Sequence, residues 1–167
     1  MAIKLIILDV DGCLTDNKIY YYNEEIIAKP FSAKDGFFIK HIMKPLGYTI
    51  AIITGGESKI VENRAKVIDI DHIYTGCMNK SDKLDELTKM LNIDYNEVAY
   101  FGDDWFDWPA MKKCSYKGSP SDGEEEIKSR VDFVSTLKGG EGSVREFLVS
   151  ILNKDGRYNE ALALYFD

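Results

Sequence analysis

Two carboxylates, Asp9 and Asp11, stand at the end of a run of apolar residues that starts at Leu5. The run predicts a fully buried strand, and side chains alternate along a strand, so both acids face the same way if the strand continues unbroken. Ligands of open α/β sheets bind beyond the carboxyl ends of the strands. One carboxylate there could attack a phosphorus atom while the other handles the proton, with a metal ion between them. The alternative is a strand end that carries two solvated acids.

A second acidic cluster repeats this layout. Residues 98–101 predict another buried strand, which runs into Asp103 and Asp104, with Asp107 shortly after. If the two strands are parallel, both clusters reach the same edge of one sheet. Carboxylates that converge there repel one another unless a divalent cation neutralises them, and oxygen ligands favour Mg²⁺ over zinc. The two clusters together therefore favour a magnesium site over solvated strand ends.

A third strand end offers groups that could hold phosphate. Thr54 ends an apolar stretch that begins at Tyr48, and Gly55 and Gly56 follow it. A hydroxyl beside freely presented backbone N–H groups can bind phosphate oxygens, although threonine is also common at strand ends for structural reasons alone. Lys80 stands just before an expected helix, and a lysine there could neutralise a nucleophile and a phosphoryl group together.

In order and spacing these residues resemble the four motifs of the haloacid dehalogenase superfamily of phosphatases. The first motif corresponds to Asp9–Asp16, the second to Ile53–Gly55, the third to Lys80, and the fourth to Gly102–Asp107. The first and fourth motifs, with Ser32–Gly36, are similar to a small branch of the superfamily that has no cap domain. That branch contains the phosphatases of 3-deoxy-octulosonate 8-phosphate and of nonulosonate 9-phosphates, which are sialic-acid-like sugars.

The resemblance implies a role for each acid. Asp9 would be the nucleophile that forms an aspartyl-phosphate, and Asp11 would protonate the leaving alkoxide and later deprotonate water. Mg²⁺ would be held by Asp9, Asp103 and the backbone carbonyl of Asp11. Asp104 would be a further ligand or would hold ordered water. Asp107 would orient a neighbour or Lys80, unless it is only an acid in the first turn of a helix.

The resemblance also implies contacts to the substrate. Thr54 and Gly55 would bind phosphate oxygens, and Lys80 would act in both catalysis and phosphate binding. Arg64 could grip the carboxylate of an α-keto acid in a bidentate manner, because a guanidinium matches that geometry. Alternatively, Arg64 lies on a solvated helix face with Glu62.

The sequence departs from the octulosonate phosphatase pattern at two positions. Those enzymes carry Thr-Gly-Arg in the second motif, where this chain has Thr54 to Glu57, and they carry Gly-Gly-Arg-Gly where this chain has Glu141. Both changes remove positive charge near the expected substrate. They favour a nonulosonate (KDN-like) 9-phosphate, whose extra hydroxyls could donate to Glu57, over 3-deoxy-octulosonate 8-phosphate. The sequence is also compatible with a phosphatase for another small ester and with a non-catalytic, phosphatase-like binding domain.

The composition of the 167-residue chain fits a single domain over residues 1–167. Its formal net charge of −7 argues against binding to nucleic acid or to an anionic membrane surface. An anionic substrate must therefore be recruited by local cations. The three cysteines lack ligand-like spacing, which disfavours zinc and disulfides and favours reduced thiols in the cytoplasm.

The elements expected to position these residues alternate along the chain. Buried strands are expected near residues 5–8, 48–53 and 98–101, and a short strand at 72–74. Further short strands are expected between 115 and 134, with helices between and after the strands. This alternation predicts a three-layer, doubly wound α/β fold whose sheet is mostly parallel. The expected fold is Rossmann-like, of the haloacid dehalogenase type, and has no cap domain.

One aromatic segment stands apart from this alternation. Residues 19–29 are rich in aromatic and β-branched types around a turn at Asn23-Glu24, which predicts a β-hairpin within residues 17–30. The hairpin could pack as an edge on its own domain. In the capless branch that the chain resembles, this hairpin reaches a neighbouring subunit, and a tetramer supplies the missing lid. An exposed aromatic hairpin needs a partner surface, which favours an oligomer, and the resemblance implies that this oligomer is a homotetramer.

Overall fold

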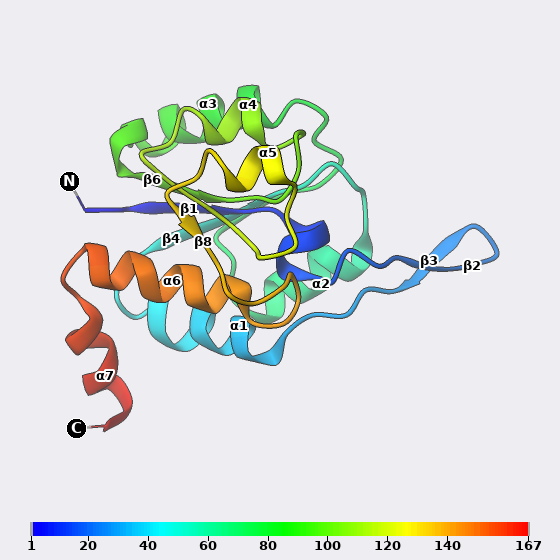
Figure 1. The fold of residues 1–167 in the computed structure, drawn as a ribbon. Coiled ribbons are helices and arrows are strands. Elements are labelled where there is room, and N and C mark those ends of the chain that lie inside the picture. The colour runs from blue at the N-terminus through cyan, green and yellow to red at the C-terminus, as the bar shows by residue number, and fades with distance from the viewer. Residues whose placement is uncertain (1, 167) are drawn as a thin grey trace.

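A six-stranded, wholly parallel sheet forms the centre of the protein, in the order β5-β4-β1-β6-β7-β8 (Figure 1). The computed structural model describes residues 2–166. The strands are β1 (Leu5–Leu8), β4 (Thr49–Ile53), β5 (His72–Tyr74), β6 (Val98–Phe101), β7 (Tyr116–Ser119) and β8 (Phe133–Val134). The chain builds outward from β1 to β4 and β5, then crosses back to β6 on the other side of β1. The direction of winding therefore reverses beside β1, the position at which open α/β sheets bind ligands.

Helices cover both faces of the sheet and confirm the doubly wound fold. They are α1 (Ala33–Phe38, continued to Met43 by a π-helical stretch), α2 (Lys59–Val67), α3 (Lys80–Leu91), α4 (Trp108–Met111), α5 (Glu125–Lys128), α6 (Ser143–Lys154) and α7 (Tyr158–Phe166). Figure 1 shows α3, α4 and α5 on one face and α1 and α6 on the other. Over residues 2–166 no helix combines the length and the apolar character needed to cross a membrane.

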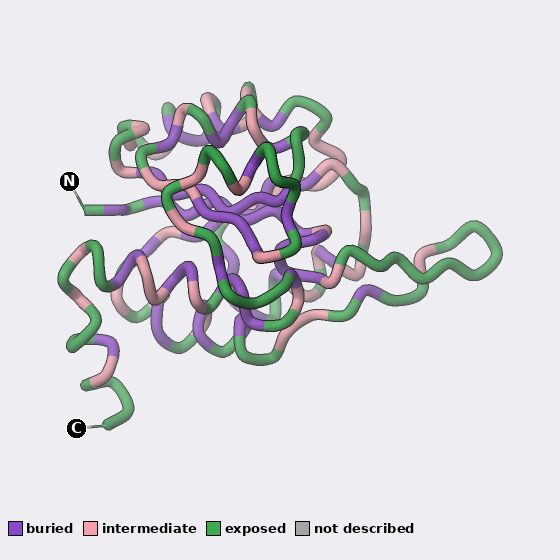
Figure 2. The backbone as a smooth tube through the Cα atoms, in the orientation of Figure 1, coloured by how far each residue is buried: buried purple, intermediate pink, exposed green. Residues whose placement is uncertain are grey.

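The alternation of side chains along β1 divides the core into two halves. Ile6 and Leu8 face the layer of α1, α2 and α6, where they belong to one buried cluster with Phe147. Leu5 and Ile7 face the opposite layer and pack in a second cluster with residues of α3 and α4. All four side chains of the strand are buried, so β1 runs through the centre of the molecule (Figure 2). Burial on both faces explains why the sequence of this strand is continuously apolar.

The parallel register places three strand ends level with one another. Leu8, the last residue of β1, pairs with Ile52 of β4 on one side and with Phe101 of β6 on the other. The residues that follow these strands therefore emerge together at one edge of the sheet. The acids after β1 and β6 and the threonine after β4, which the sequence predicts to take part in the chemistry, therefore lie at this edge.

The hairpin of β2 (Tyr20–Tyr22) and β3 (Glu25–Ala28) is a separate antiparallel sheet that projects from the domain (Figure 1). Asn23 and Glu24 at its tip both have positive φ, 47° and 66°, which is the backbone of a tight turn between twisted strands. Figure 2 shows that most of the hairpin is exposed. The alternative in which the hairpin packs on its own domain is therefore wrong.

Candidate active site

A cavity of about 220 Å³ opens where β1, β4 and β6 end. Every residue predicted to bind the metal, attack the phosphate or hold it lies in its wall. The lining consists of Asp9, Asp11, Asn17, Thr54, Gly55, Gly56, Lys80, Asp103, Asp104, Phe106 and Asp107. The fold thus brings together segments that lie almost a hundred residues apart in the sequence.

Lys80 joins two of the acids in the buried centre of this site. Its Nζ lies 2.6 Å from Oδ1 of Asp9 and 2.7 Å from Oδ1 of Asp107, and all three side chains are less than a tenth exposed. Asn79 caps α3 by accepting from the N–H of Asp82, which fixes Lys80 as the first residue of that helix. Although burial opposes the positive charge, the carboxylates of Asp9 and Asp107 together raise the pKa of Lys80. The lysine is therefore a permanent cation beside Asp9.

Asp107 organises the loop that follows β6. Besides Lys80, its carboxylate accepts hydrogen bonds from the hydroxyl of Tyr100 at 3.0 Å and from the N–H of Asp103 at 3.1 Å. The N–H of Asp104 donates a longer hydrogen bond to the same carboxylate, with 3.4 Å between its nitrogen and Oδ2 of Asp107. Asp107 is buried and orients both Lys80 and the loop, so it is not a solvated acid at the start of a helix.

Asp9 and Asp103 are crowded and buried in a way that suits a divalent cation. Burial, and then the charge of Asp107, raises the pKa of Asp9 to about 7. Burial, and then the charge of Asp9, raises the pKa of Asp103 to about 8. One oxygen of each carboxylate and the sulfur of Cys13 lie within 4.8 Å of one another. A cation between the carboxylates would remove the repulsion that raises both pKa values.

The donor set at this position fits Mg²⁺ better than a thiophilic metal. Burial raises the pKa of the Cys13 thiol well above its usual value, so the sulfur is protonated, and it donates to Oδ1 of Asp103 over 3.7 Å. The remaining donors are carboxylate oxygens, which hard cations prefer. The residues present therefore fit the magnesium ion that the sequence implies.

Asp11 reaches the site from a tight loop and not from a continued strand. The strand β1 ends at Leu8, and the chain turns through Val10–Leu14, with φ of 89° at Gly12. A side chain at Gly12 would collide with Asp103, since a Cβ there would lie 2.0 Å from its Oδ2. Glycine is therefore required both by the backbone angle and by the closeness of Asp103. The carboxylate of Asp11 is held by Lys29, whose Nζ lies 2.6 Å and 2.8 Å from its two oxygens.

Thr54 and Gly55 form the wall on the side of β4. Thr54 is buried, and its backbone N–H donates to the carbonyl of Tyr74, which anchors the strand end. Gly55 lies under Phe106, where a Cβ would come within 2.9 Å of the ring. The same ring lies 5.0 Å from Nζ of Lys80, so Phe106 shields the lysine from solvent on that side.

Two predicted substrate contacts, Arg64 and Glu57, are not among the residues that line the cavity. The guanidinium of Arg64 donates to the carbonyl of Ser32 at 3.2 Å and lies over the ring of Phe31, because α2 turns this face toward the start of α1. Arg64 is thus neither a substrate contact in this cavity nor part of a solvated pair with Glu62. Glu57 is exposed and lies beside Gly76.

The sequence shows no sign of Asn17 or Phe106 in the cavity lining, or of Lys29 behind Asp11. Gly56, which the sequence places beside Gly55 as a further source of backbone N–H groups, also lies in the lining. Phe106 lies inside the fourth motif, but its residue type alone does not distinguish it from an aromatic residue of the core. Nothing local in the sequence distinguishes Asn17 or Lys29, because their positions depend on how the hairpin leaves and re-enters the domain.

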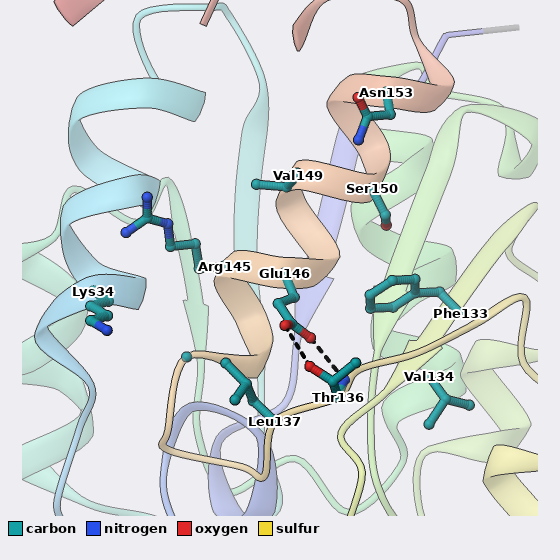
Figure 3. Close-up of a pocket in the computed structure, with 11 residues that line it drawn as sticks. Lys34, Phe133, Val134, Thr136, Leu137, Arg145, Glu146, Val149, Ser150 and Asn153 are labelled. Atoms are coloured by element: carbon teal, nitrogen blue, oxygen red, sulfur yellow. Dashed lines mark hydrogen bonds between the residues drawn. The ribbon is translucent and has the colours of Figure 1, made fainter. Parts of the chain in front are cut away.

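A larger hollow of about 470 Å³ lies elsewhere, along α6 and beside β8 and α1 (Figure 3). Val149 and Leu137 contribute apolar surface to it. Its acid, Glu146, is already bonded to Thr136, with 2.8 Å to the N–H and 2.7 Å to the hydroxyl. The acid of this hollow is therefore already satisfied, unlike the carboxylates that converge on the smaller cavity.

The chain is similar to known phosphatases over nearly its whole length. Haloacid dehalogenase-like hydrolases match as a family over residues 37–148. The 3-deoxy-D-manno-octulosonate 8-phosphate phosphatase KdsC of Escherichia coli K12 is 38% identical over 159 residues, which cover 95% of this chain and 84% of that protein. The homologous protein of Yersinia pestis is 35% identical over 162 residues, or 97% of this chain and 86% of that protein.

Solved structures show the same likeness. The crystal structure of the 3-deoxy-D-manno-octulosonate 8-phosphate phosphatase of Moraxella catarrhalis, in complex with magnesium, phosphate and KDO, has a TM-score of 0.92 and 37% identity, covering 98% of this chain and 93% of that one. The cobalt-bound enzyme of Haemophilus influenzae has a TM-score of 0.89 and 31% identity, with coverage of 93% and 91%.

Proposed function

The chain belongs to the haloacid dehalogenase-like hydrolases, and from this premise we propose that it is a magnesium-dependent phosphomonoesterase acting on a 3-deoxy-2-keto sugar acid phosphate. The observation that carries the proposal is the buried arrangement in which Lys80 bridges Asp9 and Asp107 while Asp103 faces Asp9. Such an arrangement of charge is costly for folding, and buried charged groups with shifted pKa values are typical of catalytic sites. It suits a reaction that passes through a highly anionic transition state.

In the proposed reaction Asp9 attacks the phosphorus atom. Lys80 holds Oδ1 of Asp9, and the other oxygen forms the new bond to phosphorus as the bond from phosphorus to the sugar oxygen breaks. Asp11 gives its proton to the departing sugar oxygen and later takes one from the water that attacks the aspartyl-phosphate. Thr54 and Gly55 hold phosphate oxygens at the wall of the cavity.

A bound Mg²⁺ would be held by Asp9, Asp103 and the backbone carbonyl of Asp11, and it would supply positive charge beside the phosphoryl oxygens. Asp104 lies in the cavity lining, where it would be a further ligand or would hold an ordered water. Asp107 acts through Lys80 and the loop after β6. These assignments follow the geometry of the described side chains and the resemblance of the four motifs.

The first substrate to test is 3-deoxy-D-manno-octulosonate 8-phosphate, because the relatives described above are named for it. The preference for a nonulosonate 9-phosphate that the sequence suggested finds no support among these relatives. It rests on the acids Glu57 and Glu141, and both are exposed and outside the cavity lining. The 9-phosphate remains the second candidate, because both arginines of the octulosonate pattern are missing from this chain. Gly56, followed by the acid Glu57, stands at the first position, and Glu141 stands at the second.

The test is the release of phosphate from a panel of esters in the presence of Mg²⁺. The panel contains the octulosonate 8-phosphate, a nonulosonate 9-phosphate and glucose 6-phosphate, and Asp9→Asn protein is the control. We expect kcat/KM to be highest for the octulosonate ester and lowest for glucose 6-phosphate. A higher value for the nonulosonate ester would reverse the order of the two sugar acids. No release above the control with any ester would support a binding domain.

We also propose that the protein is a homotetramer in which the hairpin of β2 and β3 docks on a neighbouring subunit. The support is the exposure of its aromatic residues, with Tyr21 and Tyr22 both more than 60% exposed. A cavity at the sheet edge of a chain without a cap domain also gains shelter from a neighbour. The location proposed from the sequence is the cytoplasm, and it agrees with the three free cysteines.

A further inference from the structure

Lys29 is buried at the place where the exposed hairpin returns to the domain. It follows β3 directly and precedes Phe31, which forms a β-bridge with Thr15. Its side chain is only 2% exposed, whereas the residues of β3 before it are largely exposed. A lysine is rarely buried unless it is paired, so its position calls for a partner.

The partner of Lys29 is Asp11, the proposed acid and base. The ammonium contacts both carboxylate oxygens, at 2.6 Å and 2.8 Å, while the carboxylate itself remains about a quarter exposed toward the cavity. An ammonium held against both oxygens by charge-assisted hydrogen bonds keeps the carboxyl group in one place. Lys29 therefore holds the carboxyl group of Asp11 in place, as Lys80 holds that of Asp9.

We propose that Lys29 is a positioning residue that aims the carboxyl group of Asp11 at the leaving oxygen, so that the base of the hairpin sets the geometry of proton transfer. This inference rests on the proposed function. Lys29 keeps its own protons throughout. The proton that the sugar oxygen gains comes from Asp11, and Asp11 regains a proton from the water that attacks the aspartyl-phosphate.

The role predicts a dependence on the leaving group that a structural role would not produce. An ester with a basic leaving oxygen needs the proton from Asp11 as its bond to phosphorus breaks, whereas a nitrophenolate leaves without one. The ratio kcat/KM reports the reaction only up to the first irreversible step, in which the alcohol departs. The later attack of water, which is the same for all esters, does not enter it.

The experiment compares phenyl phosphate with p-nitrophenyl phosphate, two esters of similar size. Phenol has a pKa of about 10, as in the tyrosine side chain, and nitrophenol is considerably more acidic. For Lys29→Met we expect kcat/KM to fall about 10²-fold with phenyl phosphate and by no more than about threefold with p-nitrophenyl phosphate. Lys29→Arg, which restores a cation and two donors, should recover most of the loss with phenyl phosphate.

Two further variants keep the test decisive. Lys29→Gln retains a donor without the charge and is measured beside Lys29→Met, so that the result does not depend on one substitution being tolerated. Lys117→Met is the matched control, because Lys117 forms a 2.8 Å ion pair with Asp132 away from the cavity. We expect the control variant to have the wild-type kcat/KM with both phenyl phosphate and p-nitrophenyl phosphate. Thermal unfolding of each variant verifies that it is folded at the assay temperature.

The outcomes separate this inference from the function on which it rests. If Lys29→Met and Lys29→Gln reduce kcat/KM equally for both esters, Lys29 acts on the fold alone and the inference is overturned. If both variants match the wild type with phenyl phosphate, Lys29 has no part in the reaction. If the wild type hydrolyses no phosphate ester, the proposed function itself fails.

Discussion

Raising the pH of the metal-free protein from about 6 to about 8 should destabilise it, and Mg²⁺ should prevent that loss. The folded protein holds Asp9 and Asp103 with pKa values of about 7 and about 8, against 3.8 for an ordinary aspartate. At pH values above 3.8 and below the folded pKa of each group, the unfolded chain has released a proton that the folded chain still binds. Stability is therefore fully present at low pH and is lost as the pH rises through the folded pKa values.

The size of the loss follows from the number of protons involved. Asp103 holds its extra proton across the whole interval from about pH 6 to about pH 8, and Asp9 holds its own over about half of it. At 1.36 kcal/mol for each proton and pH unit, the loss is about 4 kcal/mol. For a chain of this length each kcal/mol shifts Tm by about 2–4 °C, so Tm should fall by about 8–16 °C.

Other shifted carboxyl groups do not obscure this window. Burial raises the pKa of Asp35 only to about 6, so that group contributes little above this pH. Hydrogen bonds lower the pKa of Glu97 and Glu146, and the stability that such groups contribute is lost only in acid, as the pH falls through their folded values. The fall between about pH 6 and about pH 8 therefore reports the cavity.

The assay is thermal unfolding across this pH range, in EDTA and in saturating Mg²⁺. Asp103→Asn removes one of the two raised groups and also relieves Asp9, so it should abolish more than half of the fall in EDTA and most of the stabilisation by Mg²⁺. Asp69→Asn is the control, since Asp69 is exposed and its left-handed backbone, with φ of 59°, accepts asparagine. A Tm in EDTA that is level or rises with pH would refute the electrostatic account of the site, as would an unchanged fall in Asp103→Asn.

Three other outcomes are expected. Lys80→Met should lower the free energy of unfolding by about 3–5 kcal/mol in urea titrations, because it leaves Asp9 and Asp107 buried without their cation; an unchanged midpoint would contradict the buried ion pairs. Serine at all three positions of Tyr20–Tyr22 should reduce the molar mass measured by light scattering and raise KM for the sugar phosphate more than for p-nitrophenyl phosphate. A mass equal to that of the wild type would argue against docking by the hairpin. Ca²⁺ should restore little activity after EDTA treatment, because it prefers more ligands at longer distances than Mg²⁺, and equal rates with both ions would contradict the assigned metal site.

The residues of the site could be predicted because they follow strands that the sequence marks clearly. The buried runs before Asp9 and Asp103 are continuously apolar, and parallel pairing of β1 with β6 places their ends side by side. Lys80 could be predicted only from its place in the order of the motifs, because nothing in its own surroundings points to Asp9. Its contacts span 71 and 27 residues, and they exist only because the cap at Asn79 starts α3 at the sheet edge.

Contacts that depend on the path of a loop could not be predicted in this way. Lys29 reaches Asp11 because the chain leaves the domain after Asp16, turns at Asn23-Glu24 and returns along β3. Arg64 was expected near the substrate from its helix position, but the rotation of α2 directs it to Ser32. Rotation of a helix about its axis is set by packing against its neighbours, which a single sequence does not reveal.

The central claim is that Asp9 is the nucleophile of a magnesium-dependent phosphatase. The most direct measurement is phosphate release from 3-deoxy-D-manno-octulosonate 8-phosphate by the wild type and by Asp9→Asn, each with Mg²⁺ and with EDTA. The account predicts turnover only for the wild type with Mg²⁺, while Asp9→Asn remains folded and inactive, because an amide cannot attack phosphorus. Turnover by Asp9→Asn near the wild-type rate, or full activity of the wild type in EDTA, would contradict it.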